Sequence, residues 1–512
     1  MKQRWKVLLV TSVAVFMGFL DVTIVNIAFP DIEASFPGTS LAGLSWILNA
    51  YNIVFAALLV PAGRLSDRLG RRRMFFVGVS TFLAASVVCG LAPSVEVLVA
   101  ARVVQAAGAA ILVPTSLALL LPEFPLEQRA TATALWGATG GIAAATGPAL
   151  GGVLVDATSW RWVFFVNLAI GLPALIPARR LLRESREANP GPLTDIAGIV
   201  LLVAGVGLLS LGIVKGQDWG WGSASVVGSL VASALVLAAF VARSARHPAP
   251  VIELGLLRVR SFAVANAGVF LFALGFYAVL LANILFLTSV WGWSVLRAGI
   301  AVTPGPLMAA LSATVGGRLA DRYGQRVVAL PGGLLFAAGC VVFATATGAT
   351  PHYASEFLPA TLLTGTGVGL SFAAWGSAAV AELPPSRFAT GSAISATSRQ
   401  IGAVLGIAVL VAVIGIPRPE DAVSTFHTAW VLMAIPATAA GLVALALGRV
   451  RARNPEAAVA MAAVEAECPR RDSNSQPQRL KGVRSNQLSY GGVEELRTRN
   501  RKWSARMAVF RR

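Results

Sequence analysis

The sequence contains one short stretch twice, GRLSDRLGRR at 63–72 and GRLADRYGQR at 317–326. The two copies agree at seven of ten positions, and each follows the second apolar segment of a block of six. Internal repeats of this kind are a common way of building large membrane folds. We therefore predict two related halves of six helices each, with the residues between them as an insertion.

The composition requires a membrane. The 512 residues are 56% hydrophobic and only 13% charged, with a mean hydropathy of +0.71. Soluble domains cannot bury that much apolar surface. The net charge of +18 lies in short Lys and Arg clusters between apolar segments, which indicates membrane topology and not a nucleic-acid partner. The three cysteines lie far apart without metal-ligand spacing, so we expect no metal and no cofactor.

Membrane-spanning helices need about 20 apolar residues, and fourteen segments meet this requirement. The predicted fold is an all-α polytopic bundle with two six-helix units and two additional helices between them. The first segment has basic residues before it, as a signal peptide does, but Asp21 and Asn26 interrupt it, and we predict a retained helix. The expected spans are 7–28, 43–63, 74–93, 97–121, 131–154, 161–181, 196–214, 223–242, 262–290, 296–316, 327–347, 353–381, 392–415 and 427–448.

Basic residues predict the orientation, because cytoplasmic loops carry an excess of Lys and Arg. With fourteen spans and a cytoplasmic amino terminus, the outer loops receive only Arg161, Lys215, Arg297 and Arg418. We therefore expect both termini in the cytoplasm. The inner loops receive Arg64, Arg68, Arg71, Arg72, Arg73, Arg129, Arg179, Arg180, Arg183, Arg186, Arg243, Arg246, Arg258, Arg260, Arg318, Arg322, Arg326 and Arg387.

Several tryptophans fall at the outer helix ends of this topology, where indole prefers the headgroup boundary. We predict an aromatic belt on the lipid-facing surface. Its members are Trp46, Trp160, Trp162, Trp219, Trp221, Trp291 and Trp293.

Further motifs extend over the whole predicted bundle. They are FLDVTIVNIAFP at 19–30, RVVQAAGAA at 102–110, ATGPALGG at 145–152, WRWVFFVN at 160–167 and SRQIGAVLGIAV at 398–409. Together with the duplicated loop, they resemble the fourteen-helix drug:proton antiporter family of the major facilitator superfamily. The resemblance implies a secondary active transporter and not an enzyme, which exports small amphipathic organic compounds such as drugs and antibiotics in exchange for protons.

The resemblance and the loop charges give a domain plan and a location. We expect an N-terminal bundle at 1–185, two inserted helices at 186–260 and a C-terminal bundle at 261–448. A basic tail at 449–512 is expected to be disordered in the cytoplasm. Its length departs from the family, whose members commonly end soon after the last helix. The expected setting is a bacterial inner membrane, with a monomer whose partners are substrate, protons and lipid.

Asp21 and Arg102 are the main functional candidates. At 1.5 Å per residue, Asp21 lies about 21 Å into the first helix and Arg102 reaches a similar height in the fourth. Ionisable residues inside a membrane are costly, which favours a functional role. Pairing between the two is plausible, and the resemblance assigns proton coupling to the RVVQ arginine. A purely structural ion pair is the alternative.

Three other groups of residues are candidates. The first is a polar network in a central cavity, formed by Asn26, Gln105, Asn283, Arg399 and Gln400, of which Arg399 could instead extend to the inner interface. The second is a cytoplasmic latch, which the resemblance assigns to the duplicated loop, with a tight turn whose arginines only set the topology as its alternative; its residues are Gly63, Asp67, Arg68, Gly70, Arg71, Asp321 and Arg322. The third is a segment that the resemblance identifies as an antiporter signature, with close helix packing as its alternative, and it comprises Gly147, Pro148, Gly151 and Gly152.

Two rival functions remain open from the sequence. A proton-coupled importer would share the fold. An integral membrane enzyme or receptor would need a catalytic motif or an extramembrane domain, and we find no Walker loop, metal cluster or nucleophile motif.

Overall fold

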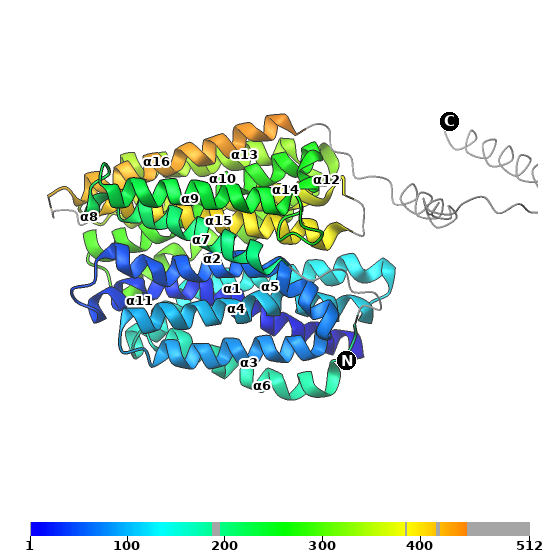
Figure 1. The fold of residues 1–512 in the computed structure, drawn as a ribbon. Helices are drawn as coiled ribbons and strands as arrows, with labels where there is room; N and C mark the ends of the chain where they lie inside the picture. Colours follow the sequence, from blue (N-terminus) through cyan, green and yellow to red (C-terminus); the bar gives the residue numbers. More distant parts are fainter. Residues whose placement is uncertain (1, 187–194, 384–386, 416–419, 448–512) are drawn as a thin grey trace, which may run out of the picture. The chain divides into compact units, whose positions relative to one another are not determined.

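The computed structural model describes residues 2–186, 195–383, 387–415 and 420–447, without the side chains of 126–127, 129–131, 133–134, 321 and 389. The predicted tail at 449–512 lies outside the described residues. Sixteen α-helices lie in these ranges (Figure 1). They are α1 Gln3–Ser35, α2 Leu41–Leu69, α3 Arg71–Gly90, α4 Val95–Leu120, α5 Leu126–Ala157, α6 Trp162–Leu181, α7 Ile196–Val214, α8 Gly216–Trp219, α9 Ala224–Ser244, α10 Arg260–Leu285, α11 Val295–Val302, α12 Pro304–Tyr323, α13 Arg326–Ala346, α14 Leu358–Val380, α15 Phe388–Ile414 and α16 Ala422–Val443.

Fourteen membrane spans result from these helices. The four-residue α8 is too short to cross, and α11 and α12 together form one span. The break between them has a local cause, because Pro304 lacks the N–H that would continue the ladder of α11. The all-α fold with fourteen spans is therefore confirmed for the described residues, although one span that the sequence presents as a single helix is broken.

Helix starts follow from capping side chains. Ser40, Ser94, Ser223 and Ser294 each accept a hydrogen bond from the backbone N–H three residues later, at the first turns of α2, α4, α9 and α11. Such caps satisfy N–H groups that have no partner within the helix. All four lie at one end of the bundle. We call the other end, where α2, α6, α9 and α12 finish and α3, α10 and α13 begin, the arginine-rich end.

The packing of the helices repeats between the two halves. In the first half, α1 packs against α4, α5 and α6, while α4 packs against α2 and α3. In the second half, α10 packs against α14, α15 and α16, while α14 packs against α12 and α13. In addition, α3 packs against α6 in the first half, and α13 packs against α16 in the second, so that each helix pair of the first half has a counterpart in the second. The repeated loop sequence therefore corresponds to a repeated arrangement of six helices.

The inserted hairpin of α7 and α9 packs against α2 of the first half and α15 of the second. Leu202 and Val206 of α7 share a buried cluster with Ile53 of α2 and Val404 of α15. Figure 1 shows α7 beside α2 and α15. The hairpin therefore covers a seam between the two halves.

Two of the seven belt tryptophans differ from the prediction. Trp160 and Trp291 are buried, with 1% and 6% of their surfaces exposed. Their indole N–H groups donate to Ser35 Oγ and to the carbonyl of Gly348, both at 2.9 Å. Because these partners lie within the protein, both rings pack inward beneath the helix ends, and the belt assignment is wrong for them.

Candidate functional site

A buried ion pair links α1 and α4. Asp21 and Arg102 are 0% and 1% exposed, and Arg102 Nη1 donates to Asp21 Oδ2. The same Nη1 donates to Gln105 Oε1 at 2.7 Å, and Arg102 Nε donates to the carbonyl of Ile47 in α2 at 3.1 Å. The pairing expected from matching depths is therefore present in the structure.

The Asp21 carboxylate accepts further hydrogen bonds. Gln105 Nε2 donates to Asp21 Oδ1 at 2.8 Å and to Ser86 Oγ of α3 at 2.9 Å. Asn167 of α6 donates to the same Asp21 oxygen at 3.3 Å and to Ser86 Oγ at 3.4 Å. The cluster thus joins side chains of four helices, α1 with Asp21 itself and α3, α4 and α6, and the carbonyl of a fifth, α2, holds the arginine. We call these residues the Asp21 network.

The other face of the arginine is covered by an aromatic ring. Arg102 Cζ lies 4.0 Å from the ring centroid of Tyr51, which stacks on Phe55 with 6.0 Å between centroids. A guanidinium over an aromatic face is attracted electrostatically, and more strongly where water is excluded. The Tyr51 hydroxyl is buried and, among the described residues, makes no hydrogen bond. The Asn167 Oδ1 atom of the network is likewise buried without a hydrogen-bond partner among the described residues, so both groups could bond a new partner.

Two sequence candidates have other roles. Asn26 donates to the carbonyl of Val22 in its own helix at 2.6 Å. Asn283 accepts a 3.0 Å hydrogen bond from the Trp430 indole and so connects α10 to α16. Neither has a hydrogen bond to the Asp21 network.

Arg399 and Gln400 in α15 lie apart from that network. Arg399 Cζ is 5.9 Å from the ring centroids of Phe19 in α1 and Phe372 in α14. The Arg399 Nε and Gln400 Oε1 atoms are buried without a hydrogen-bond partner among the described residues. An arginine therefore lies between aromatic rings of the two halves, and no carboxylate of the described residues pairs with it.

Glycines in α5 lie at two helix contacts. A Cβ on Gly147 would clash with Thr23 of α1, and one on Gly151 would lie 2.8 Å from Ile24 Cγ1. A Cβ on Gly152 would lie 2.9 Å from the Leu296 Cα of α11, and Gly299 of α11 faces the carbonyl of Pro148. The motif thus lets α5 pack closely against α1 of its own half and α11 of the other half, at the end opposite the arginine-rich end.

The first copy of the duplicated loop turns at Gly70. Its φ of +112° favours glycine, and Gly324 in the second copy has φ +95°. Asp67 accepts from Arg71 Nε at 2.7 Å, whereas Arg68 is exposed. A Cβ on Gly63 would lie 3.5 Å from the Cβ of Pro114 in α4, which is an ordinary contact.

In the second copy, Arg322 lies over the Tyr323 ring at 5.3 Å. The side chain of Asp321 lies outside the described residues. A pairing comparable to that of Asp67 and Arg71 is therefore described in the first copy alone.

An ion-pair bridge that the sequence does not reveal joins the halves at the arginine-rich end. Glu253, between α9 and α10, pairs with Arg64 of α2 at 2.9 Å and with Arg387 at the start of α15 at 2.7 Å. Arg64 also donates to the carbonyl of Pro250 at 3.0 Å. The segment after the inserted hairpin thus ties α2 to α15.

Within the described ranges, no three His, Cys, Asp or Glu side chains gather into a group that could hold a metal ion. The family model "Major Facilitator Superfamily" matches residues 11–257 and 265–510. The chain belongs to the major facilitator superfamily. This confirms the resemblance drawn from the motifs and makes the chain a member of a transporter family.

The curated relatives of this superfamily member carry names of export and resistance. The chain is 35% identical to "Multidrug resistance protein Stp" of Mycobacterium tuberculosis (strain CDC 1551 / Oshkosh) over 79% of this chain and 74% of that protein. It is 35% identical to the "Probable actinorhodin transporter" of Streptomyces coelicolor over 80% and 72%. It is 32% identical to the "Tetracenomycin C resistance and export protein" of Streptomyces glaucescens over 79% and 75%.

Solved structures of peptide transporters share this fold. A crystal structure of a mutant peptide transporter POT in complex with sulfate superposes with a TM-score of 0.61 at 16% identity, covering 86% of this chain and 93% of that one. At this identity the likeness concerns the fold alone. The chain is thus a multi-pass membrane protein of the major facilitator fold.

Proposed function

We propose that this chain is a proton-coupled antiporter that exports small amphipathic organic compounds, including drugs and antibiotics, from a bacterial cell. The observation that carries the proposal is the Asp21 network, a carboxylate buried in the bundle with an arginine beside it. Intramembrane ionisable groups of this kind are costly and typical of proton pathways. The printed names of the relatives support export of organic compounds.

The coupling step follows from the charges. A proton on Asp21 cancels its charge and weakens its hold on Arg102, which leaves a buried cation without an anionic partner. Arg102 is then held by Tyr51 and by its hydrogen bonds to Gln105 and the Ile47 carbonyl alone, so its side chain can shift to a position of lower free energy. Release of the proton restores the ion pair. Substrate binding that favours one of these two states exchanges substrate for proton.

Alternating access requires the two bundles, 1–185 and 261–448, to separate at one end at a time. When the contact of Gly152 with Leu296 breaks, the central site becomes accessible from the outside. When the bridge of Glu253 with Arg64 and Arg387 breaks, the site becomes accessible from the cytoplasm. In this proposal the arginine-rich end and both termini are cytoplasmic, and residues 186–260 are an inserted accessory. The transporter acts as a monomer in the inner membrane.

The direction of transport is tested in everted membrane vesicles from bacteria that express the full chain, with a panel of fluorescent amphipathic compounds. An acidic vesicle interior should drive accumulation of at least one compound, and a protonophore should abolish it. Accumulation in right-side-out vesicles alone would identify an importer. If the chain changes neither flux nor drug susceptibility across the panel, the proposal of export is wrong.

A further inference from the structure

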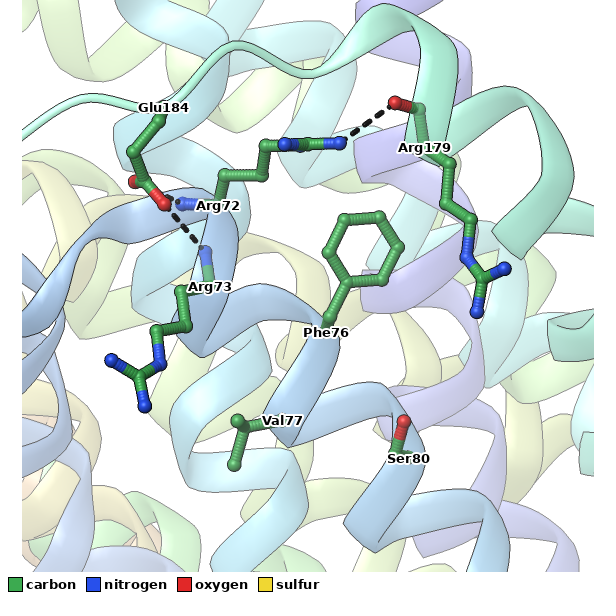
Figure 2. A pocket seen from close by; sticks show the side chains of 7 residues that line it. All are labelled: Arg72, Arg73, Phe76, Val77, Ser80, Arg179 and Glu184. Atoms are coloured by element: carbon green, nitrogen blue, oxygen red, sulfur yellow. Dashed lines mark hydrogen bonds between the residues drawn. The ribbon is translucent and has the colours of Figure 1, made fainter.

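A pocket of about 520 Å³ lies at the arginine-rich end of the first half, between the start of α3 and the end of α6 (Figure 2). None of the residues of the Asp21 network lines this pocket. Arg72, Arg73 and Phe76 come from α3, Arg179 comes from α6, and Glu184 follows α6.

The single carboxylate of the pocket is already engaged. Glu184 accepts hydrogen bonds from the backbone N–H groups of Arg72 at 3.0 Å, Arg73 at 3.1 Å and Ser185 at 3.1 Å. It makes no salt bridge with an arginine side chain of the described residues. Three arginines therefore face one carboxylate whose hydrogen bonds go to the backbone.

The arginines differ in how they are held. Arg72 donates through Nη2 to the carbonyl of Arg179 at 2.9 Å and lies over Phe76, with 5.6 Å from Cζ to the ring centroid. The Arg73 and Arg179 guanidinium groups make no hydrogen bond or ion pair within the described part of the chain. Figure 2 shows their side chains on opposite sides of the Phe76 ring. Two cationic groups without a protein partner therefore flank the pocket, one on each side of this ring.

The remaining lining residues are Phe76, Val77 and Ser80 of α3. Val77 is 43% exposed, and Ile176, outside the pocket near the end of α6, is 64% exposed. Exposed aliphatic side chains on membrane-spanning helices face hydrocarbon. A ligand of this pocket therefore meets cations at the level of the membrane surface and an apolar surface below.

We propose that this pocket binds the headgroup of an anionic phospholipid, with Arg73 and Arg179 attracting its phosphodiester from the two sides of the pocket and an acyl chain along Phe76 and Val77. Arginine is suited to phosphate because its planar donors match the phosphate oxygens. Basic pockets between helices at the cytoplasmic side are typical sites for such headgroups. The segment 183–186, which leads to the inserted hairpin, is fixed beside the headgroup through Glu184.

The test is native mass spectrometry of the purified full chain in detergent, with added dioleoyl phosphatidylglycerol, dioleoyl phosphatidylethanolamine or glycerol 3-phosphate. Wild type should retain phosphatidylglycerol in preference to phosphatidylethanolamine. Because each basic side chain near an anionic surface contributes about 5.4-fold to the affinity, the variant R73Q/R179Q should bind phosphatidylglycerol about 30-fold more weakly.

The matched control is R258Q/R260Q, which removes two exposed arginines from the same end of the bundle and should bind as wild type does. R73K/R179K keeps both charges and should retain most of the binding, which separates lost contacts from lost folding. Equal binding by R73Q/R179Q and wild type, or equal retention of the two lipids, would overturn the proposal. Displacement of the lipid by an equal concentration of glycerol 3-phosphate would also overturn it, in favour of a soluble phosphate ester.

Discussion

The Asp21–Arg102 pair is stabilised by neighbours that leave neither charge exposed. Burial of an ion pair is costly, and it is offset only when the remaining hydrogen-bonding capacity is also satisfied. Here Gln105 and Asn167 donate hydrogen bonds to the Asp21 carboxylate. The Ile47 carbonyl accepts a hydrogen bond from Arg102, and the Tyr51 ring covers its guanidinium group. The pair is therefore sensitive to a change of charge on either partner.

We predict that D21N destabilises the protein more than the double variant D21N/R102Q does. The single change leaves Arg102 as a buried charge without a counter-ion, which costs roughly 3–5 kcal/mol, whereas the double change removes both charges. The measurement is thermal unfolding of the purified variants in detergent. Destabilisation of the double variant by the sum of the two single effects would contradict the charge argument.

Sequence reasoning identified Asp21, Arg102 and Gln105 because charged and amide side chains stand out within apolar segments. It gave Ser86 and Tyr51 no role, since hydroxyl groups are common in membrane helices and carry no charge. Glu253 was missed for a different reason. It lies in a loop of ordinary polarity, and its partners Arg64 and Arg387 are 189 and 134 residues away in the chain.

At the scale of helices and loops, the two copies of the duplicated loop share a turn but differ in their surroundings. Gly70 and Gly324 both have positive φ, yet a Cβ on Gly70 would lie 2.8 Å from the Glu184 carboxyl group, whereas one on Gly324 would meet nothing within 4 Å. The Glu184 side chain can move aside, but only by giving up its hydrogen bonds to the first turn of α3.

We therefore predict that G70A costs more stability than G324A. Both substitutions carry the strain of a left-handed backbone, about 1–2 kcal/mol, and G70A adds about 1 kcal/mol for the displaced Glu184 cap. Thermal unfolding of the two variants measures the difference. In an E184A background the two substitutions should cost the same, and a persistent difference would show that Glu184 is not its cause.

The inserted hairpin is fastened by Asp195, whose carboxylate caps α7 at the Gly198 N–H and accepts from Arg243 Nε of α9 at 2.6 Å. Burial raises the pKa of Asp195, but the two hydrogen bonds together with the charges of His247 and Arg243 hold the pKa below its usual value. A carboxyl whose folded pKa is depressed stabilises the fold above its unfolded pKa. This contribution is lost as the pH falls through the folded pKa.

We predict that D195N lowers the unfolding temperature at neutral pH and that its difference from wild type shrinks below about pH 4. Asparagine can still cap α7, so the difference reports the charge. The measurement is thermal unfolding of both proteins over a range of pH. A difference that stays constant in acid would show that the depressed pKa contributes nothing to the stability of the hairpin.

Over the whole molecule, the sequence predicted fourteen spans and a duplication, because hydropathy and a ten-residue repeat are local signals. The broken span at Pro304 and the inward-facing Trp160 and Trp291 depend on neighbours that hydropathy does not contain. The place of the hairpin of α7 and α9 over the α2–α15 seam was equally hidden. The bridge of Glu253 lies at the arginine-rich end of that seam.

We predict that E253Q loosens the two halves at this end, since it removes the shared anion of Arg64 and Arg387. The measurement is double electron–electron resonance between spin labels at Leu69 and Phe388, both exposed, in a background without the three cysteines. The distance between the two labels should be longer in E253Q than in the protein with Glu253. E356Q, which alters an ion pair with His352 at the opposite end, is the control. An unchanged distance distribution in E253Q would mean that the bridge does not hold the halves together.

The most direct test of coupled exchange at Asp21 records drug flux and proton flux together in proteoliposomes that enclose a pH-sensitive dye. Wild-type protein should move protons in the direction opposite to that of each exported compound. D21N should lose this drug-dependent proton movement. D218N, which changes an exposed acid outside the spans, should retain it. Drug-dependent proton movement in D21N equal to that of wild type would contradict the account.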